Sequence, residues 1–197
     1  MTLSSEFFME IKKGTWTVKS TEIKYKNLWI EVREDKVIRP DGKDGIFGVV
    51  TMNSGVSVLP YDEEGNVYLT EEYHYGVGRV TIEVVSGAID GDESALDAAK
   101  RELREEAGLS ATEWIDFASL DPFTTVVVSP NHMYLARGLS IGESEQEGTE
   151  TIKMKKVPFP QALEWAMNGT ISHGASVAVI LKTALFLGEN QKSNQTN

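Results

Sequence analysis

The segment 87–109, GAIDGDESALDAAKRELREEAGL, constrains this chain more than any other part of it. Ser94 followed by Asp97 has the spacing of a helix N-terminal cap, and Gly108 suits a left-handed helix C-terminus. The apolar positions between these ends recur at helical spacing and form one stripe, made of Leu96, Ala99, Leu103 and Ala107. The segment therefore predicts an amphipathic helix that packs one face on a core.

Three glutamates, Glu102, Glu105 and Glu106, lie on the flank next to this stripe. Like charges this close repel each other, and a hard cation is the usual reason to hold them together. Ala98 shares the flank and is small, so we expect the carboxylates to point away from the buried side with room for a metal ion. The glycine-rich turn at 87–91 allows the backbone to approach a ligand closely. A solvated acidic helix is the alternative, but the pattern favours a magnesium site and phosphate chemistry.

The composition limits the class of protein. The 197 residues suffice for one domain with a full core, or for one domain with a small N-terminal extension. The net charge of −11 argues against nucleic acid and anionic membranes as partners. Cysteine is absent, which excludes a disulfide framework and a thiol nucleophile. The sequence shows no secretory segment and no long apolar run, so we expect a cytoplasmic protein.

The pattern along the chain predicts a strand-rich fold. Strands are expected at 15–18, 28–32, 36–38, 46–51, 55–59, 67–73, 80–85, 114–118, 124–128, 132–138 and 152–157. Two further helices are expected at 160–167 and 175–187, followed by a disordered tail at 189–197. Helices inserted after strands favour a mixed sheet between helices, an α/β/α sandwich.

The segment 87–109 also matches every fixed position of the Nudix hydrolase signature. The matching residues are Gly87, Glu93, Arg101, Glu102, Leu103, Glu105, Glu106, Gly108 and Leu109. With NLWIEVREDKVIRPDG (27–42) and the C-terminal helices, the chain resembles the branch of ADP-ribose and nucleoside-diphosphate-sugar pyrophosphatases. The resemblance implies a Nudix-type α/β (α+β) sandwich with a mixed sheet in residues 51–188. It also implies a small antiparallel β-sheet subdomain in residues 1–50 that forms a homodimer.

The carboxylates suit the chemistry of a pyrophosphate bridge, whose negative oxygens repel nucleophiles. A bound magnesium ion neutralises that charge and positions a water molecule. Glu102 and Glu106, four residues apart, are the first candidates for metal ligands, with Glu105 next. The resemblance agrees and adds the backbone carbonyl of Ser86, with Mg²⁺ as the expected ion and Mn²⁺ as the alternative.

Glu93 and Arg101 are expected to pair with each other and brace the turn rather than to touch substrate. Arg101 also precedes Glu105 by four residues, so it can orient or neutralise that carboxylate.

A general base must lie near the attacking water. The resemblance places the base and a further metal ligand in a loop before the last strand, which here is the acidic segment 142–150. Glu150 aligns best with both roles, and Glu147 is the next candidate for the base. Glu105, on the helix, is the alternative base, and a solvated loop is the alternative interpretation of the segment.

Five residues near the signature are candidates for substrate contacts. Relatives often have an arginine where His74 follows Tyr73, and Arg79 is the candidate to replace it. Glu83 stands where many relatives keep a glutamate, and Ala88 lies in the glycine-rich turn. The alternative is that Tyr73 is a core aromatic residue and His74 a surface histidine.

Trp29 and Phe47 lie on predicted N-terminal strands and could cover a nucleobase by stacking, with positions in the core as the alternative. Relatives that hydrolyse ADP-ribose often carry a proline shortly after the signature, where this chain has Thr124 and Thr125.

The sequence thus predicts a Mg²⁺-dependent hydrolase that cleaves the pyrophosphate bond of a nucleoside diphosphate linked to another moiety. ADP-ribose or a nucleotide sugar is the expected substrate, giving a nucleoside monophosphate and a sugar phosphate. Hydrolysis of dinucleoside polyphosphates or other nucleotides is the second hypothesis, and a non-catalytic nucleotide-binding module is the third. A purely structural dimerisation domain would not explain the carboxylate helix.

Overall fold

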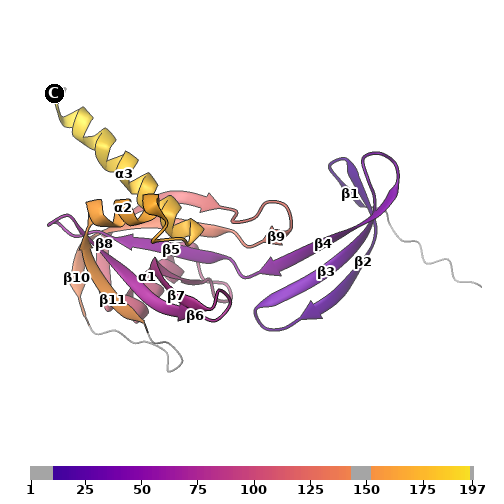
Figure 1. Cartoon of the computed structure of the whole chain (residues 1–197), viewed down its shortest axis with the longest axis horizontal. Helices are drawn as coiled ribbons and strands as arrows, with labels where there is room; N and C mark the ends of the chain where they lie inside the picture. The colour runs from indigo at the N-terminus through magenta and orange to yellow at the C-terminus, as the bar shows by residue number, and fades with distance from the viewer. Residues whose placement is uncertain (1–10, 143–151, 196–197) are drawn as a thin grey trace, which may run out of the picture. The chain divides into compact units, whose positions relative to one another are not determined.

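The computed structural model (Figure 1) describes residues 11–142 and 152–195 and divides into two compact units. The first unit ends at Asn53 and also takes in Phe123–Ser129, and the second contains Ser54–Pro122 and the chain from Pro130 onward. The sequence places the boundary at residue 50 and leaves 123–129 in the second domain. That segment returns to the first unit because its backbone pairs with the end of an N-terminal strand.

The first unit is one five-stranded sheet with the order β1-β2-β3-β4-β9. Its strands are β1 (Ile11–Lys13), β2 (Trp16–Lys26), β3 (Ile30–Ile38), β4 (Asp44–Met52) and β9 (Val127–Val128). The first four strands pair antiparallel, as the sequence predicts, and the short β9 joins β4 in parallel. The turn from β3 to β4 contains Gly42, whose φ of 79° explains a glycine there.

The second unit contains a six-stranded sheet with the order β11-β6-β7-β5-β10-β8. Its strands are β5 (Gly55–Pro60), β6 (Asn66–His74), β7 (Arg79–Ala88), β8 (Leu109–Leu120), β10 (Asn131–Ile141) and β11 (Lys153–Pro158). β5 and β10 are parallel and the other neighbours are antiparallel, so the sheet is mixed, as predicted.

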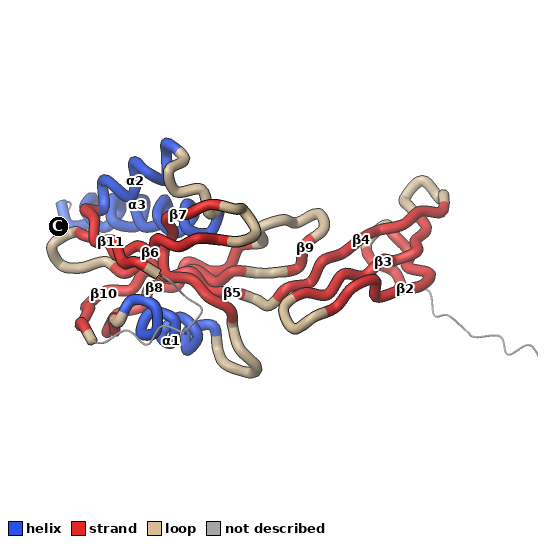
Figure 2. Tube along the Cα trace, turned by 60° about the horizontal axis from the view of Figure 1, so that its bottom comes forward, coloured by secondary structure: helices blue, strands red, loops and turns tan. Residues whose placement is uncertain are grey.

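Three helices cover the two faces of this sheet. α1 (Ala95–Ala107) lies on one face, and α2 (Phe159–Asn168) and α3 (Gly174–Gln195) lie on the other, as Figure 2 shows. The predicted α/β/α sandwich is therefore confirmed. α3 continues past Gly188, so residues 189–195 are helical rather than part of the disordered tail expected from composition. None of the helices within residues 11–142 and 152–195 has both the length and the apolar character needed to cross a membrane.

Each face of the sheet has its own apolar core. Toward α1, the core contains Val56, Val58 and Val85 from the strands and Ala98, Ala99 and Leu103 from the helix. Toward α2 and α3, it contains Leu59, Leu69, Val84, Leu135, Ala162, Ile171, Val179 and Ile180, among others. Strand residues alternate between the two cores because successive side chains of a strand point to opposite faces.

The ends of α1 are those that the sequence predicts. The Ser94 hydroxyl accepts a hydrogen bond from the Asp97 backbone N–H at 3.1 Å, which caps the first turn. Gly108 ends the helix with a φ of 62°, and its N–H bonds to the Arg104 carbonyl at 2.9 Å. Both helix ends are thus held by local contacts. These contacts fix the length of the helix, and with it the positions of the helix carboxylates.

Leu103 anchors α1 to the sheet and is fully buried. We expect Leu103→Ala to lower the free energy of unfolding by about 3 kcal/mol, because the deletion removes buried apolar surface and leaves a cavity. Urea denaturation followed by circular dichroism measures this loss. Leu185→Ala on the exposed side of α3 is the matched control, with an expected loss below about 1 kcal/mol. Equal losses for the two variants would contradict the packing described.

Candidate active site

The carboxylate helix packs directly against the end of strand β7. A side chain at Gly87 would overlap the Glu102 carboxylate, since a Cβ built there falls far inside van der Waals contact with its oxygens. Only glycine leaves the space that Glu102 occupies. Ser86, one residue earlier, lies opposite Ser57 on β5. The strand end and the helix face therefore form one surface.

Arg101 organises the acidic side chains around this surface. Its guanidinium donates to Glu93 at 2.7 Å, to Glu102 at 2.8 Å and to Glu105 at 3.1 Å. It also donates to the backbone carbonyl of Ala88 at 2.9 Å. We call these five residues the Arg101 network. It connects the glycine-rich turn to two successive turns of α1.

The pairing of Glu93 with Arg101 that the sequence predicts is present. The hydrogen bond from Arg101, with another from the Asp90 N–H, lowers the pKa of Glu93 despite the cost of burial. Hydrogen bonding to Glu93, with further help from Glu102 and Glu105, raises the pKa of Arg101. Glu93 and Arg101 therefore stabilise each other's charged forms, and the turn is held by charge-assisted hydrogen bonds.

The carboxylate flank is more buried than the sequence suggests. Glu102 and Glu106 are 9% and 7% exposed, and Ala98 is fully buried in the core beneath α1. The expectation that this flank points away from the buried side is therefore wrong for these three residues. The helix lies closer to β5 and β7 than its apolar stripe alone implies, because Gly87 leaves room for it. Glu105 is half-buried.

A second group of polar side chains surrounds Glu83 on β7. Its carboxylate lies 3.2 Å from His74 Nε2 and 3.0 Å from His173 Nδ1, and it accepts a hydrogen bond from the Thr81 hydroxyl at 2.6 Å. His173 Nδ1 is also 2.9 Å from the Ser176 hydroxyl. We call these five residues the Glu83 cluster.

Burial disfavours the charged form of Glu83, but hydrogen bonds from His173 and Thr81 and the charge of the imidazoles outweigh it and lower its pKa. The sequence identifies His74 and Glu83 but gives no signal for His173 or Ser176. Those two residues lie about ninety positions further along the chain, and no local spacing links them to β7.

The remaining candidates near the signature have different surroundings. Tyr73 is 55% exposed, so it is not the core aromatic residue of the alternative interpretation. Arg79 donates to the Ser172 hydroxyl at 2.8 Å. Ala88 is exposed, and its carbonyl belongs to the Arg101 network. Glu147 and Glu150 lie outside the described residues.

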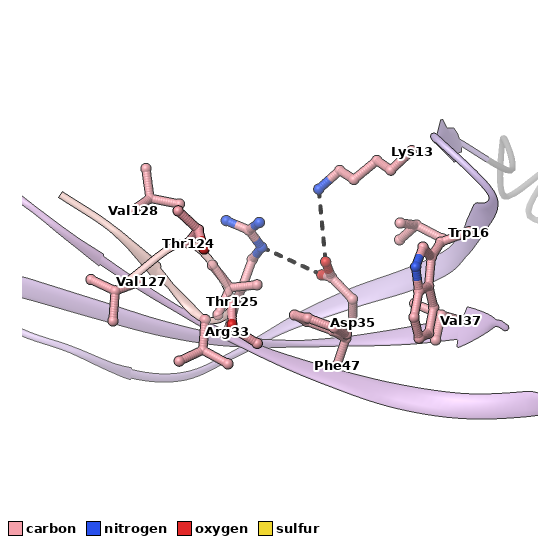
Figure 3. A pocket seen from close by; sticks show the side chains of 13 residues that line it. Lys13, Trp16, Arg33, Asp35, Val37, Phe47, Thr124, Thr125, Val127 and Val128 are labelled. Carbon is pink, nitrogen blue, oxygen red and sulfur yellow. Dashed lines mark ion pairs between the residues drawn. The ribbon is translucent and has the colours of Figure 1, made fainter. Parts of the chain in front are cut away.

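The two aromatic candidates of the first unit are in different environments. Phe47 packs edge-on against Trp16, with ring centroids 5.5 Å apart, and both line a cavity of about 250 Å³. Figure 3 shows Asp35 inside this cavity, with Lys13 and Arg33 on either side of its carboxylate. Trp29 is 68% exposed and does not line the cavity, so it is not the core residue of the alternative interpretation.

Comparison with known proteins identifies the family to which this arrangement belongs. A model of the NUDIX domain matches residues 51–174, which include the whole carboxylate helix and its turn. The chain belongs to the Nudix family. A model described as the nucleoside diphosphate sugar hydrolase N-terminal domain matches residues 16–50, within the first unit.

The relatives of this Nudix hydrolase include pyrophosphatases. An ADP-ribose pyrophosphatase of Mycobacterium tuberculosis is 30% identical over 166 residues, which cover 82% of this chain and 80% of the relative. The methanol dehydrogenase activator of Bacillus methanolicus is 24% identical over 169 residues, covering 83% of this chain and 89% of the relative. A crystal structure of an ADP compounds hydrolase shares the fold, with a TM-score of 0.78 at 18% identity, covering 89% of this chain and 95% of that one. The chain is thus an ADP-ribose-pyrophosphatase-like enzyme of the Nudix family.

Nudix hydrolases generally use divalent metals, and the acidic flank of α1 fits such an ion in its chemistry. Glu102 and Glu106 are buried carboxylates, and hard divalent cations prefer oxygen ligands. Because Gly87 has no side chain, the Glu102 carboxylate can lie next to the backbone of β7. Within residues 11–142 and 152–195, however, no three acidic or histidine side chains stand close enough to hold an ion as they lie. Arg101 occupies two of the carboxylates instead.

Gly87→Ala tests the contact between strand and helix. The added methyl group displaces the Glu102 carboxylate, so we expect the affinity for Mn²⁺, used as a probe ion, to fall about tenfold. Titration of free Mn²⁺ by electron paramagnetic resonance measures this. Gly188→Ala is the matched control, because nothing lies within 4 Å of a Cβ placed there. Unchanged Mn²⁺ affinity in a folded Gly87→Ala variant would mean that Glu102 does not bind the ion.

Proposed function

We propose that this Nudix enzyme hydrolyses the pyrophosphate bond of a nucleoside diphosphate linked to another moiety, in a Mg²⁺-dependent reaction. ADP-ribose or a nucleotide sugar is the substrate, and a nucleoside monophosphate and a sugar phosphate are the products. The observation that carries the proposal is the burial of Glu102 and Glu106 on one helix flank, directly against the strand end at Gly87. Hard divalent cations prefer oxygen ligands, and this surface brings two carboxylates next to the backbone of a strand end.

Glu102, Glu105 and Glu106, with the carbonyl of Ser86, are the residues that would hold the ion, with Mn²⁺ as the alternative to Mg²⁺. When bound, a divalent ion neutralises the charge of the diphosphate and lowers the pKa of a coordinated water. Arg101 already places a positive charge against Glu102 and Glu105. We infer that Arg101 keeps these carboxylates ionised and oriented when no ion is present.

The chain offers three candidates for the base that takes the proton from the attacking water. Glu150 is the first candidate and is also proposed as a metal ligand. Glu147 is the second candidate. Glu105 is the third and lies on the described helix, half-buried and hydrogen-bonded to Arg101. A carboxylate held by an arginine is a weak base, so Glu105 would need to leave Arg101 to act.

The relatives support the choice of substrate. The Mycobacterium tuberculosis relative is an ADP-ribose pyrophosphatase, and so is a Bacillus subtilis relative that is 27% identical over 140 residues. We propose Tyr73, His74, Arg79, Glu83 and Ala88 in the second unit as residues that contact or position the substrate. Phe47 and Trp29 are proposed to contact the nucleobase.

We also propose that the protein is a homodimer formed through the first unit. In residues 11–53 and 123–129, that unit is a single sheet with no helix on either face, and it exposes many large apolar side chains. They are Ile11, Ile23, Tyr25, Leu28, Trp29, Ile46 and Met52, with Phe123, Val126 and Val128 from the returning segment. Extended apolar surface of this kind is typical of an interface. A cytoplasmic location stays a prediction from the sequence.

Glu106→Gln tests the proposed function. The variant keeps the shape of the side chain but removes the charge, so we expect turnover to fall at least about 100-fold, which corresponds to ~3 kcal/mol of transition-state stabilisation. The measurement is phosphate released after phosphatase coupling, with ADP-ribose, nucleotide sugars and dinucleoside polyphosphates as substrates, with and without Mg²⁺.

Glu63→Gln, in the exposed turn before β6, is the matched control and should retain wild-type turnover. Wild-type activity in a folded Glu106→Gln variant would refute the metal assignment. Preference for dinucleoside polyphosphates would select the second hypothesis, and binding of nucleotides without turnover would select the non-catalytic module.

The dimer is tested by the mass in solution. Light scattering after size exclusion should give twice the chain mass of 21.8 kDa, because the exposed apolar sheet of the first unit is then covered. Trp29→Glu and Ile46→Glu place charges on this surface and should shift the mass toward that of the single chain. A monomeric wild-type protein at micromolar concentration would contradict the proposal.

A further inference from the structure

We propose that His173 is a positioning residue of the hydrolytic site, which acts by holding the Glu83 carboxylate together with His74. The inference rests on the proposed function, because it concerns the strand that leads to Ser86 and Gly87. His173 lies in the segment between α2 and α3, far from the signature in sequence. No spacing in the chain pairs it with the other two residues.

The geometry leaves both oxygens of Glu83 occupied. Oε1 accepts from Thr81 at 2.6 Å and lies 3.2 Å from His74 Nε2, and Oε2 lies 3.0 Å from His173 Nδ1. Glu83 is only 9% exposed, while the two imidazoles are 40% and 33% exposed. A buried carboxylate is therefore held by two half-exposed imidazoles. A buried charge left without such partners would be strongly destabilising, so His173 is essential to this arrangement.

The same segment is tied to β7 at two further points. The backbone N–H of Val84 donates to the Ser176 hydroxyl at 3.0 Å, and Arg79 donates to the Ser172 hydroxyl at 2.8 Å. Ser172, His173 and Ser176 thus hold β7 over six residues. Val84 is also where β7 changes its neighbour, because β7 pairs with β6 up to Val84 and with β5 from Val85 onward.

The position of β7 matters for the site because Gly87 is three residues after Val84. The Glu102 carboxylate lies directly against Gly87. A strand advances about 3.3 Å per residue, so the Glu83 cluster lies roughly 10 Å along the strand from the metal-binding surface. A shift of β7 at Val84 would move Ser86 and Gly87 relative to Glu102. Misplacement of about 1 Å in an active site can cost a factor of 100 in rate.

Few other charged groups face the Glu83 cluster. Glu72 lies opposite Thr81 in the register of β6 and β7, and Arg79 is bonded to Ser172. β5 and the first turns of α3, through Ile180, carry no charged side chain. The two imidazoles are therefore the partners on which the Glu83 carboxylate depends.

Two replacements of His173 separate its roles. The side-chain nitrogen of asparagine is as many bonds from the backbone as Nδ1, so His173→Asn keeps the hydrogen bond to Glu83 but cannot be protonated. His173→Leu removes both. The third histidine of the chain, His132 on β10, supplies the control His132→Asn, which should match the wild type. The readouts are kcat, KM and the Mg²⁺ concentration for half-maximal rate, with ADP-ribose as substrate, at pH 6 and pH 8.

We expect kcat of His173→Leu to fall about tenfold while that of His173→Asn stays within about twofold of the wild type. The same ranking is expected at pH 6 and at pH 8, because asparagine keeps the hydrogen bond to Glu83 at both. Equal kcat for wild type and a folded His173→Leu variant would overturn the inference. So would equal damage in the Asn and Leu variants.

The proposed function and this inference fail in different ways. If the wild type hydrolyses no substrate, the proposed function fails. Thermal unfolding then tests by itself whether His173 holds Glu83. His173→Asn should melt within about 2 °C of the wild type and His173→Leu at least about 4 °C lower. Equal melting temperatures for the two variants would show that His173 does not hold Glu83.

Discussion

The structure of the site depends on one guanidinium. Arg101 binds three carboxylates and a backbone carbonyl, and it does so between a glycine-rich turn and a buried helix flank. Without it, Glu102 and Glu105 would repel each other beside a sheet that already buries Glu102. One cation for three anions leaves negative charge in excess, however. The Arg101 network therefore orders the carboxylates of the flank and leaves a net negative charge that attracts a further cation. A metal-dependent hydrolase needs such an ordered, negatively charged site before the ion binds.

Local signals in the sequence were enough to predict the elements of this arrangement. Ser94 and Gly108 mark the ends of α1, and both cap the helix as expected. The mixed sheet between helices follows from the order of predicted strands and helices, and the antiparallel N-terminal sheet was implied by the resemblance to the family. Burial of the flank did not follow, because the helical period gives the direction of a side chain but not the distance to the next element. That distance is set by Gly87, whose missing side chain allows Glu102 to lie against the strand.

Contacts between distant parts of the chain were beyond the sequence for a different reason. Val127 and Val128 form only a two-residue parallel pairing with Val50 and Thr51, too short to leave a pattern of its own. His173 has no periodic partner, since its role depends on where a loop between two helices comes to rest on the sheet. The residue types and local spacing at these positions give no signal of such contacts, so only the folded structure shows them.

Strand β7 connects these observations. Its first half pairs with β6 and carries Glu83, and its second half pairs with β5 and carries Gly87. Near this change of partner, the backbone N–H of Val84 bonds to Ser176 of α3. The helix layer on one face of the sheet thus stabilises the strand on which the carboxylate helix of the other face depends. The two helix layers are in this way coupled through the backbone of one strand, which carries the Glu83 cluster at one end and the proposed metal-binding surface at the other.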